Sequence, residues 1–152
     1  MPPGSEERDA LIRACPSCGT KNRVPPAHLA DVGKCGRCKA ALPAMSEPIV
    51  ADPATFAEIT GSATVPVLVD FWAEWCGPCR MAAPEVAKTA QAMSGRALVL
   101  KVDTDAHPAL AQQFNVSGIP NFVVMRDGKV VFQQAGMVRQ PQMEKWLREA
   151  GS

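Results

Sequence analysis

The segment that decides the fold reads Val65-Pro66-Val67-Leu68-Val69-Asp70-Phe71-Trp72-Ala73-Glu74-Trp75-Cys76-Gly77-Pro78-Cys79. Its first eight residues form a β-branched, apolar run of the kind that fills a central strand buried on both faces. Beyond the two cysteines, apolar residues recur at helical spacing over 77–94, and Pro78 is tolerated in a first helical turn. The sequence therefore predicts that Cys76 and Cys79 lie where a strand ends and a helix begins.

This position favours the ionised form of a sulfur. The N-terminus of a helix carries unpaired N–H groups and about half a positive charge, which stabilise a thiolate over a thiol. We expect Cys76 to be exposed and partly ionised, and Cys79, one turn into the helix, to be shielded. Two cysteines at this spacing can pass electrons between dithiol and disulfide forms. Because nucleophilicity falls as the pKa falls, acidity alone gains only about threefold in rate, and docking geometry should matter more.

The composition limits the classes of function. A chain of 152 residues has room for one ordinary domain and an appendage, and a formal net charge of +1 gives no reason to expect nucleic acid or a membrane as partner. No stretch approaches the roughly 18 apolar residues of a transmembrane helix. The N-terminus is acidic and lacks a hydrophobic signal region, so we expect a cytoplasmic protein. Because thiols stay reduced there, the six cysteines indicate metal binding and catalysis rather than a disulfide scaffold.

Two further Cys-x-x-Cys pairs precede this segment, at the spacing of four-cysteine zinc sites. Residues 15–45 hold too few large apolar side chains to fold unaided, whereas metal binding contributes about 10–16 kcal/mol in zinc-finger peptides. We therefore predict a zinc ribbon over 15–45 with one structural Zn²⁺; two disulfides or free thiols are the alternative. Its ligands would be Cys15, Cys18, Cys35 and Cys38. The surplus of basic residues around them is too small to predict nucleic-acid binding.

The rest of the chain predicts a flexible leader over 1–14 and a second domain over 46–152. In that domain the patterns indicate strands at 48–51, 65–72, 97–103, 121–126 and 129–134, and helices at 53–59, 77–94, 106–114 and from about 140. Asp127-Gly128 indicates a two-residue hairpin. The order implies an α/β fold whose sheet starts parallel and closes with an antiparallel hairpin.

Asp70 is the one charge in an otherwise apolar strand. A carboxylate is costly there unless it is paired or neutralised, and burial raises its pKa. From the strand pattern alone, some compensating group is required, and the pattern does not identify it.

Taken together, several motifs resemble the thioredoxin family over essentially all of residues 47–150. They are Val69-Asp70-Phe71-Trp72-Ala73-Glu74-Trp75-Cys76-Gly77-Pro78-Cys79-Arg80, Lys101-Val102-Asp103, Gly118-Ile119-Pro120 and Asp127-Gly128. The cysteine-rich segment in front is similar to that of the zinc-containing second thioredoxins of bacteria, the thioredoxin 2 group. The resemblance implies the thioredoxin fold, a central mixed five-stranded sheet flanked by four helices, preceded by a small zinc-ribbon domain.

The resemblance also implies catalytic roles. Cys76 would attack a substrate disulfide, and Cys79 would resolve the mixed disulfide, leaving a redox-active Cys76–Cys79 disulfide. Asp70 would accept the proton of the resolving cysteine, with Lys101 nearby. A buried Asp70–Lys101 ion pair with only a structural role is the alternative.

A substrate-binding rim is implied as well. In the family the bond before the matching proline is cis, which here is Ile119–Pro120, and the backbone of Ile119 would pair with an extended substrate strand. The apolar rim would be completed by Trp75, Gly77, Pro78 and Gly136. Two residues depart from the family pattern: Glu74 stands where many members have Pro, and Asn121 replaces a Thr. We expect Glu74 to oppose thiolate formation slightly and to bias the choice of substrates.

The leading interpretation is a monomeric protein-disulfide reductase that acts on disulfide-containing proteins. The resemblance implies that an NADPH-dependent flavoprotein, thioredoxin reductase, recharges it. The competing interpretation is a binding module, in which the ribbon senses oxidants or holds a partner and the redox fold is secondary.

Overall fold

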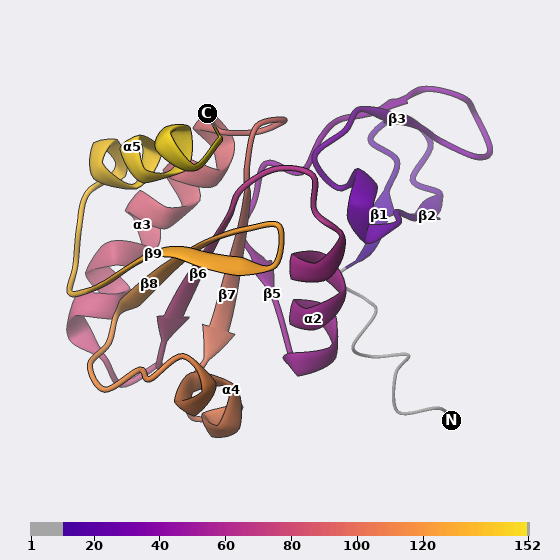
Figure 1. Ribbon diagram of the computed structural model, residues 1–152. Coiled ribbons are helices and arrows are strands. Elements are labelled where there is room, and N and C mark those ends of the chain that lie inside the picture. Colours follow the sequence, from indigo (N-terminus) through magenta and orange to yellow (C-terminus); the bar gives the residue numbers. More distant parts are fainter. Residues whose placement is uncertain (1–10, 152) are drawn as a thin grey trace.

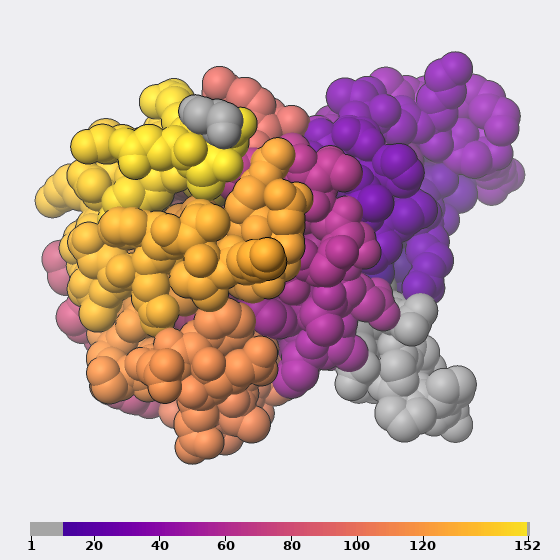
Figure 2. Space-filling model, viewed as in Figure 1, coloured from indigo at the N-terminus to yellow at the C-terminus, as the bar shows by residue number. Residues whose placement is uncertain are grey.

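The computed structural model describes residues 11–151, which form a small ribbon and a larger body (Figure 1). We use "ribbon" for residues 11–45, which hold two short hairpins, and "body" for residues 46–151, which hold a five-stranded sheet. Figure 2 shows the ribbon as a lobe that projects from one side of the body. The elements are β1 (Ile12–Ala14), β2 (Lys21–Arg23), the 3-10 turn η2 (Pro26–His28), β3 (Gly33–Lys34), β4 (Ala41–Leu42), β5 (Ile49–Val50), α2 (Pro53–Ser62), β6 (Val67–Trp72), α3 (Gly77–Ala92), β7 (Leu98–Asp103), α4 (Pro108–Gln113), β8 (Asn121–Arg126), β9 (Lys129–Ala135) and α5 (Gln140–Gly151).

The sheet of the body has the strand order β5-β7-β6-β8-β9. β5, β7 and β6 are parallel, whereas β8 pairs antiparallel with both β6 and β9. The predicted mixed sheet with four flanking helices is confirmed, and the hairpin turn falls at Asp127-Gly128 as expected. Element ends differ from the predicted ones by a few residues, because ends fray and carry the weakest sequence signals.

Two helices cover each face of the sheet. The core on one face joins side chains of α2 and α4 with Val67, Val69 and Phe71 of β6. The core on the other face joins side chains of α3 and α5 with Leu68 of the same strand. β6 is therefore buried on both sides, as its unbroken apolar run predicts.

The alternation of side chains places the two charged residues of the central strands. Asp70 lies two residues after Leu68, so it faces the α3 side of the sheet. Lys101 lies two residues after Val99, which also packs on the α3 side. Asp70 and Lys101 are direct partners in the parallel pairing of β6 with β7. The two charges therefore share the face that is covered by the helix carrying Cys79.

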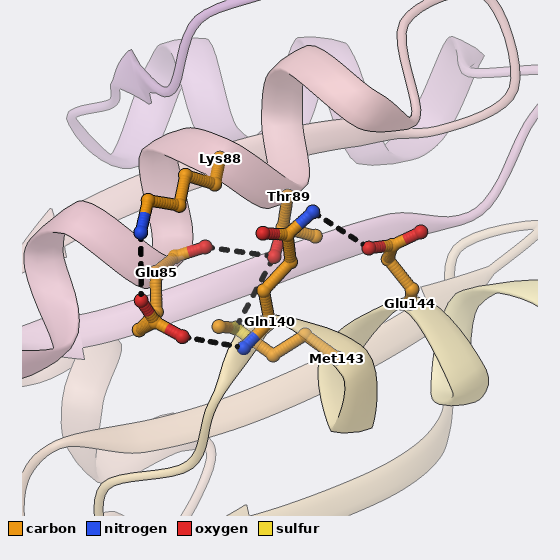
Figure 3. A network of polar contacts seen from close by, with 6 residues as sticks. All are labelled: Glu85, Lys88, Thr89, Gln140, Met143 and Glu144. Atoms are coloured by element: carbon orange, nitrogen blue, oxygen red, sulfur yellow. Dashed lines mark hydrogen bonds and ion pairs between the residues drawn. The ribbon is translucent and has the colours of Figure 1, made fainter.

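Helix α5 is held against α3 by a polar network (Figure 3). The backbone N–H of Gln140, at the start of α5, donates to Glu85 Oε1 at 3.0 Å, and Lys88 Nζ lies 3.4 Å from Glu85 Oε2. The Gln140 N–H, followed by the Lys88 ammonium, lowers the pKa of Glu85. Beneath this layer, Thr89 Oγ1 lies 4.0 Å from Met143 Sδ. The network fixes the helix on which the two cysteines are mounted.

The ribbon and the body share one hydrophobic core. Leu11, Leu29 and Ala30 of the ribbon belong to the cluster on the α2 side of the sheet, and Leu29 is 0% exposed. A hydrogen bond crosses the same junction, since Ser94 Oγ of the body donates to Ala44 O of the ribbon at 3.4 Å. The ribbon's own buried cluster holds only Cys15, Cys35 and Leu42. A core of that size fits the expectation that residues 15–45 need help to fold.

The expected leader over 1–14 differs from the structure at its C-terminal end. Residues 1–10 lie outside the described residues, but Leu11 is 1% exposed and Ile12–Ala14 pairs with Lys21–Arg23. Leu11 and Ile12 are the only large apolar residues within 5–14 and form no periodic pattern, so this burial could not be predicted from the sequence. Within residues 11–151, no helix has the length and apolar character required to cross a membrane.

Candidate active site and metal centre

Cys76 and Cys79 lie at the N-terminus of α3, immediately after the strand β6, as predicted. Cys76 is the N-cap of the helix, and its Sγ accepts a hydrogen bond of 3.2 Å from the backbone N–H of Cys79. Gly77 and Pro78 occupy the first two helical positions, where a missing proline N–H costs nothing. The two cysteines are joined as a disulfide with a Cα–Cα distance of 5.2 Å. The helix N-terminus therefore directs an N–H group and its partial positive charge at the sulfur of Cys76.

Both cysteines are buried, so the expectation of an exposed Cys76 is wrong for this disulfide form. Cys76 and Cys79 are each 3% exposed. They form a small cluster with Ala73, and Trp72 and Ile119 pack against it. The Sγ of Cys76 lies 3.7 Å from the carbonyl oxygen of Ile119. Helical spacing says nothing about segments from elsewhere in the chain, and the loop that carries Ile119 covers the sulfur of Cys76.

The residues that the family pattern predicts for a substrate-binding rim lie on segments next to the disulfide. Trp75 is 68% exposed, Pro78 is exposed and Gly77 is partly exposed. The Ile119–Pro120 peptide bond is cis, as the resemblance predicts. Gly136 has a φ of +98° that favours glycine, and its N–H donates to Pro120 O at 2.8 Å. Pro120 itself is buried.

Asp105 is a rim residue that the sequence did not reveal. Its Oδ2 accepts a hydrogen bond of 2.9 Å from Trp75 Nε1 and so holds the exposed indole in place. The carboxyl ends of the parallel strands β6 and β7 meet at one edge of the sheet, which brings the segments after them together. The predicted parallel pairing of the two strands is therefore the one feature of the sequence that could have brought Asp105 close to Trp75.

Asp70 is a buried carboxylate with few polar or charged groups near it to balance its charge. It is 1% exposed, and among the described residues its Oδ1 has no hydrogen-bond partner. Burial raises the pKa of Asp70 from 3.8 to about 7, although the charge of Lys101 opposes the rise. Lys101 Nζ lies 4.6 Å from the centre of the Trp72 ring, so this indole shares the cation with the carboxylate. The result is a group that exchanges a proton near neutral pH on the α3 face of the sheet.

The four ribbon cysteines converge in space and fit a tetrahedral metal. Their Sγ atoms all lie within 4.8 Å of one another, with Cys15–Cys38 at 3.6 Å and Cys18–Cys35 at 3.7 Å. A tetrahedral zinc with Zn–S bonds of about 2.3 Å separates its sulfurs by about 3.8 Å. The backbone N–H groups of Ser17 and Arg37 point at Cys15 Sγ and Cys35 Sγ, both at 3.4 Å. The separations Cys15–Cys38 and Cys18–Cys35 therefore match the sulfur–sulfur distance of a tetrahedral Zn²⁺ site.

The pKa values of these thiols also favour a bound cation. Backbone N–H groups of Cys38 and Arg37 lower the pKa of Cys35 to about 6. The N–H of Ala40 lowers the pKa of Cys38, but partial desolvation and the neighbouring thiols outweigh it and raise this pKa to about 11. Four sulfurs this close cannot all be thiolates unless a cation balances their charge.

Asn22 joins the two cysteine knuckles and was not anticipated. Its Nδ2 donates to the carbonyl of Thr20, next to the first knuckle, at 3.0 Å, and its Oδ1 accepts the N–H of Gly36, in the second knuckle, at 2.9 Å. The same Nδ2 lies 3.5 Å from Cys35 Sγ. A polar residue between the knuckles has no distinctive sequence pattern, so only the structure reveals this link.

A thioredoxin-type sheet with a cysteine pair at the start of its covering helix defines a class, the thiol-disulfide oxidoreductases. The thioredoxin family model matches residues 47–149, and a model described as "Thioredoxin 2, N-terminal", a zinc ribbon, matches residues 14–40. The chain belongs to the thioredoxin family.

Relatives and solved structures agree with this assignment. Thioredoxin C-3 of Corynebacterium nephridii is 41% identical over 137 residues, which cover 90% of this chain and 93% of that protein. Thioredoxin 1 of Synechococcus elongatus is 44% identical over 94 residues, covering 62% of this chain and 88% of that protein. A mutant thioredoxin from Halobacterium salinarum has a similar structure, with a TM-score of 0.66 and 30% identity over 70% of this chain and 93% of its own. Thioredoxin homologues are thiol-disulfide oxidoreductases, and so is this protein.

Proposed function

We propose that the protein is a protein-disulfide reductase in which Cys76 is the nucleophile and Cys79 the resolving thiol. In the reduced form, the Cys76 thiolate attacks one sulfur of a substrate disulfide and the other substrate sulfur leaves as a thiolate. Cys79 then loses its proton and attacks Cys76 Sγ, which releases the second substrate thiolate. Two electrons pass to the substrate, and the enzyme is left with the Cys76–Cys79 disulfide.

The observation that carries this proposal is the placement of Cys76 Sγ at the N-cap of α3. The N–H of Cys79 donates to that sulfur at 3.2 Å, which stabilises negative charge during attack and during departure. The end product of the proposed cycle is the disulfide form described above.

Asp70 is proposed as the group that accepts the proton of Cys79. A general base works best when its pKa is near the operating pH, and burial raises the pKa of Asp70 to about 7. Lys101 would moderate the charge of Asp70 from the neighbouring strand. The transfer would pass through water, since among the described residues no hydrogen bond joins Asp70 Oδ1 to another group.

The substrate would bind as an extended strand across the rim. The carbonyl of Ile119, 3.7 Å from Cys76 Sγ, is available to a substrate N–H in line with the attacked disulfide. Trp75, Gly77, Pro78 and Gly136 would supply the surrounding surface, with the buried Pro120 beneath it.

The ribbon is proposed to hold one structural Zn²⁺ on Cys15, Cys18, Cys35 and Cys38. The proposed domains are residues 15–45 and 46–152. The sulfur separations support this assignment. Zinc supplies the cation that lets four thiolates lie together, and the ribbon carries out no step of the proposed cycle. We further propose that the protein works as a monomer and that an NADPH-dependent flavoprotein reductase returns the disulfide to the dithiol.

Insulin reduction in the presence of NADPH and a bacterial thioredoxin reductase tests the proposal. The Cys76→Ser variant should be inactive, and Cys79→Ser should accumulate a covalent mixed disulfide with the substrate. The potential should lie near −270 mV; a value near −120 mV would indicate an oxidant instead. Activity retained by Cys76→Ser, with the fold intact by circular dichroism, would overturn the assignment.

A further inference from the structure

The ribbon contains a groove that takes no part in metal binding or in the proposed thiol chemistry. It has a volume of about 450 Å³, within the range of protein ligand sites. We call it the ribbon groove and define it by Arg13, Arg23, Val24, Val32, Lys34 and Leu42, which line it. These residues come from both hairpins of the ribbon and from the segment between them.

The charges of the ribbon groove are predominantly positive and partly unpaired. Arg23 and Lys34 are exposed, and within residues 11–151 neither has an ion pair or a side-chain hydrogen bond. Arg13 donates to the carbonyl of Pro43, which leaves its charge uncompensated. The one carboxylate on the groove wall, Asp31, is 2.8 Å from His28 Nδ1. The groove therefore favours a ligand that carries carboxylates.

The floor of the groove indicates a polypeptide rather than a nucleic acid. Val32 is 69% exposed, the same exposed fraction as Val50 of the body, and the half-buried Val24 also lines the groove, whereas Leu42 is only 5% exposed. Residues 11–45 contain no Phe, Tyr or Trp, so the ribbon offers no aromatic platform on which bases could stack. Acidic residues that alternate with aliphatic ones match both the rim and the floor.

The position of the ribbon separates such a ligand from the dithiol. The ribbon contacts Ser94 in the turn before β7, whereas Cys76 follows the opposite, carboxyl end of β6. A six-residue strand spans about 20 Å. A ligand in the groove would therefore not cover Cys76 and Cys79.

We propose that the ribbon groove binds an acidic, extended segment of a partner protein and thereby tethers disulfide substrates to the enzyme. Binding at a second point raises the effective concentration of the substrate disulfide at Cys76 without new contacts there. The tether should lower KM for substrates that carry such a segment and leave kcat unchanged.

Fluorescence anisotropy with a labelled peptide of alternating Glu and Leu tests the binding step on the zinc-loaded full chain. The double variant Arg23→Glu/Lys34→Glu should bind the peptide at least about tenfold more weakly, because attraction becomes repulsion. Lys21→Glu/Lys129→Glu is the matched control: it changes the net charge equally at exposed residues outside the groove and should bind within about twofold of the wild type. Val32→Ser, an exposed substitution, should weaken binding about threefold.

A kinetic experiment tests the tether. The same peptide, joined by a flexible linker to a disulfide substrate, should lower KM for the wild type and not for Arg23→Glu/Lys34→Glu. Equal binding by that variant and the control would overturn the proposal. Tighter binding of single-stranded DNA than of the peptide would assign the groove to nucleic acid. Tighter peptide binding after removal of residues 1–10, which include Glu6, Glu7 and Asp9, would make this chain's own segment the occupant.

Discussion

Replacing Asp70 with Asn should stabilise the protein, and the gain should grow with pH. In the folded state burial holds the pKa of Asp70 at about 7, whereas in the unfolded chain it returns to about 3.8. Between these values the folded state keeps a proton that the unfolded state has released. The wild type therefore loses stability as the pH rises from about 4 to 7, by about 1.4 kcal/mol per pH unit.

The structure sets the size of the effect. The carboxylate is 1% exposed, so solvent screens little of the burial penalty. A rise in pKa from 3.8 to about 7 corresponds to a cost of about 4 kcal/mol above pH 7. Asn keeps the shape of the side chain and cannot ionise, so Asp70→Asn should recover an amount of this order at pH 8 and almost nothing at pH 4.

Urea unfolding of the oxidised, zinc-loaded protein between pH 4.5 and 8.5 measures this gap. The control is Glu149→Gln, which removes one negative charge from an exposed position on α5. Its difference from the wild type should stay within about 0.5 kcal/mol across the range. A difference between Asp70→Asn and the wild type that does not change with pH would refute the buried, proton-sharing carboxylate.

Three further substitutions test the fold and the rim. Leu29→Ala should lower the free energy of unfolding by about 2–5 kcal/mol in urea titrations, because Leu29 is fully buried where ribbon and body meet. Asp52→Ala should cost about 1 kcal/mol in the same assay, since Asp52 Oδ1 caps α2 by accepting the N–H of Thr55 at 2.8 Å. Asp105→Ala should raise KM for insulin about two- to tenfold with intact stability, because it releases the indole of Trp75, whereas an unchanged KM would remove Asp105 from the rim.

The parts of the structure that the sequence predicted are those with strong local patterns. The run of apolar residues in β6, the turn at Asp127-Gly128 and the helix after Cys76 each leave a periodic or positional signature, and all three are present. The mixed sheet follows from their order along the chain.

The parts that were missed depend on contacts between segments far apart in the sequence. Asp105 meets Trp75 across 30 residues, and Ile119 covers Cys76 across 43. Nothing local marks these pairs, because each forms only when the loops at one end of the sheet come together. Leu11 was missed for the same reason, since its burial depends on the body against which the ribbon packs.

The ribbon and the disulfide contact opposite faces of the sheet, so we expect the proposed metal and the disulfide to affect different properties of the protein. In the proposed arrangement Zn²⁺ would organise the ribbon, and Leu11 and Leu29 join the ribbon to the α2 face of the sheet. The disulfide is mounted on α3, on the other face, where Glu85 and Gln140 fasten the helix to α5. Loss of the proposed Zn²⁺ would therefore remove packing of the order of one or two buried leucines, about 2–5 kcal/mol of stability for each leucine. The N-cap geometry at Cys76, on which the proposed chemistry depends, does not include any of the described ribbon residues. The ribbon is thus coupled to whether the body stays folded and, through its groove, to which proteins approach, rather than to the electron transfer itself.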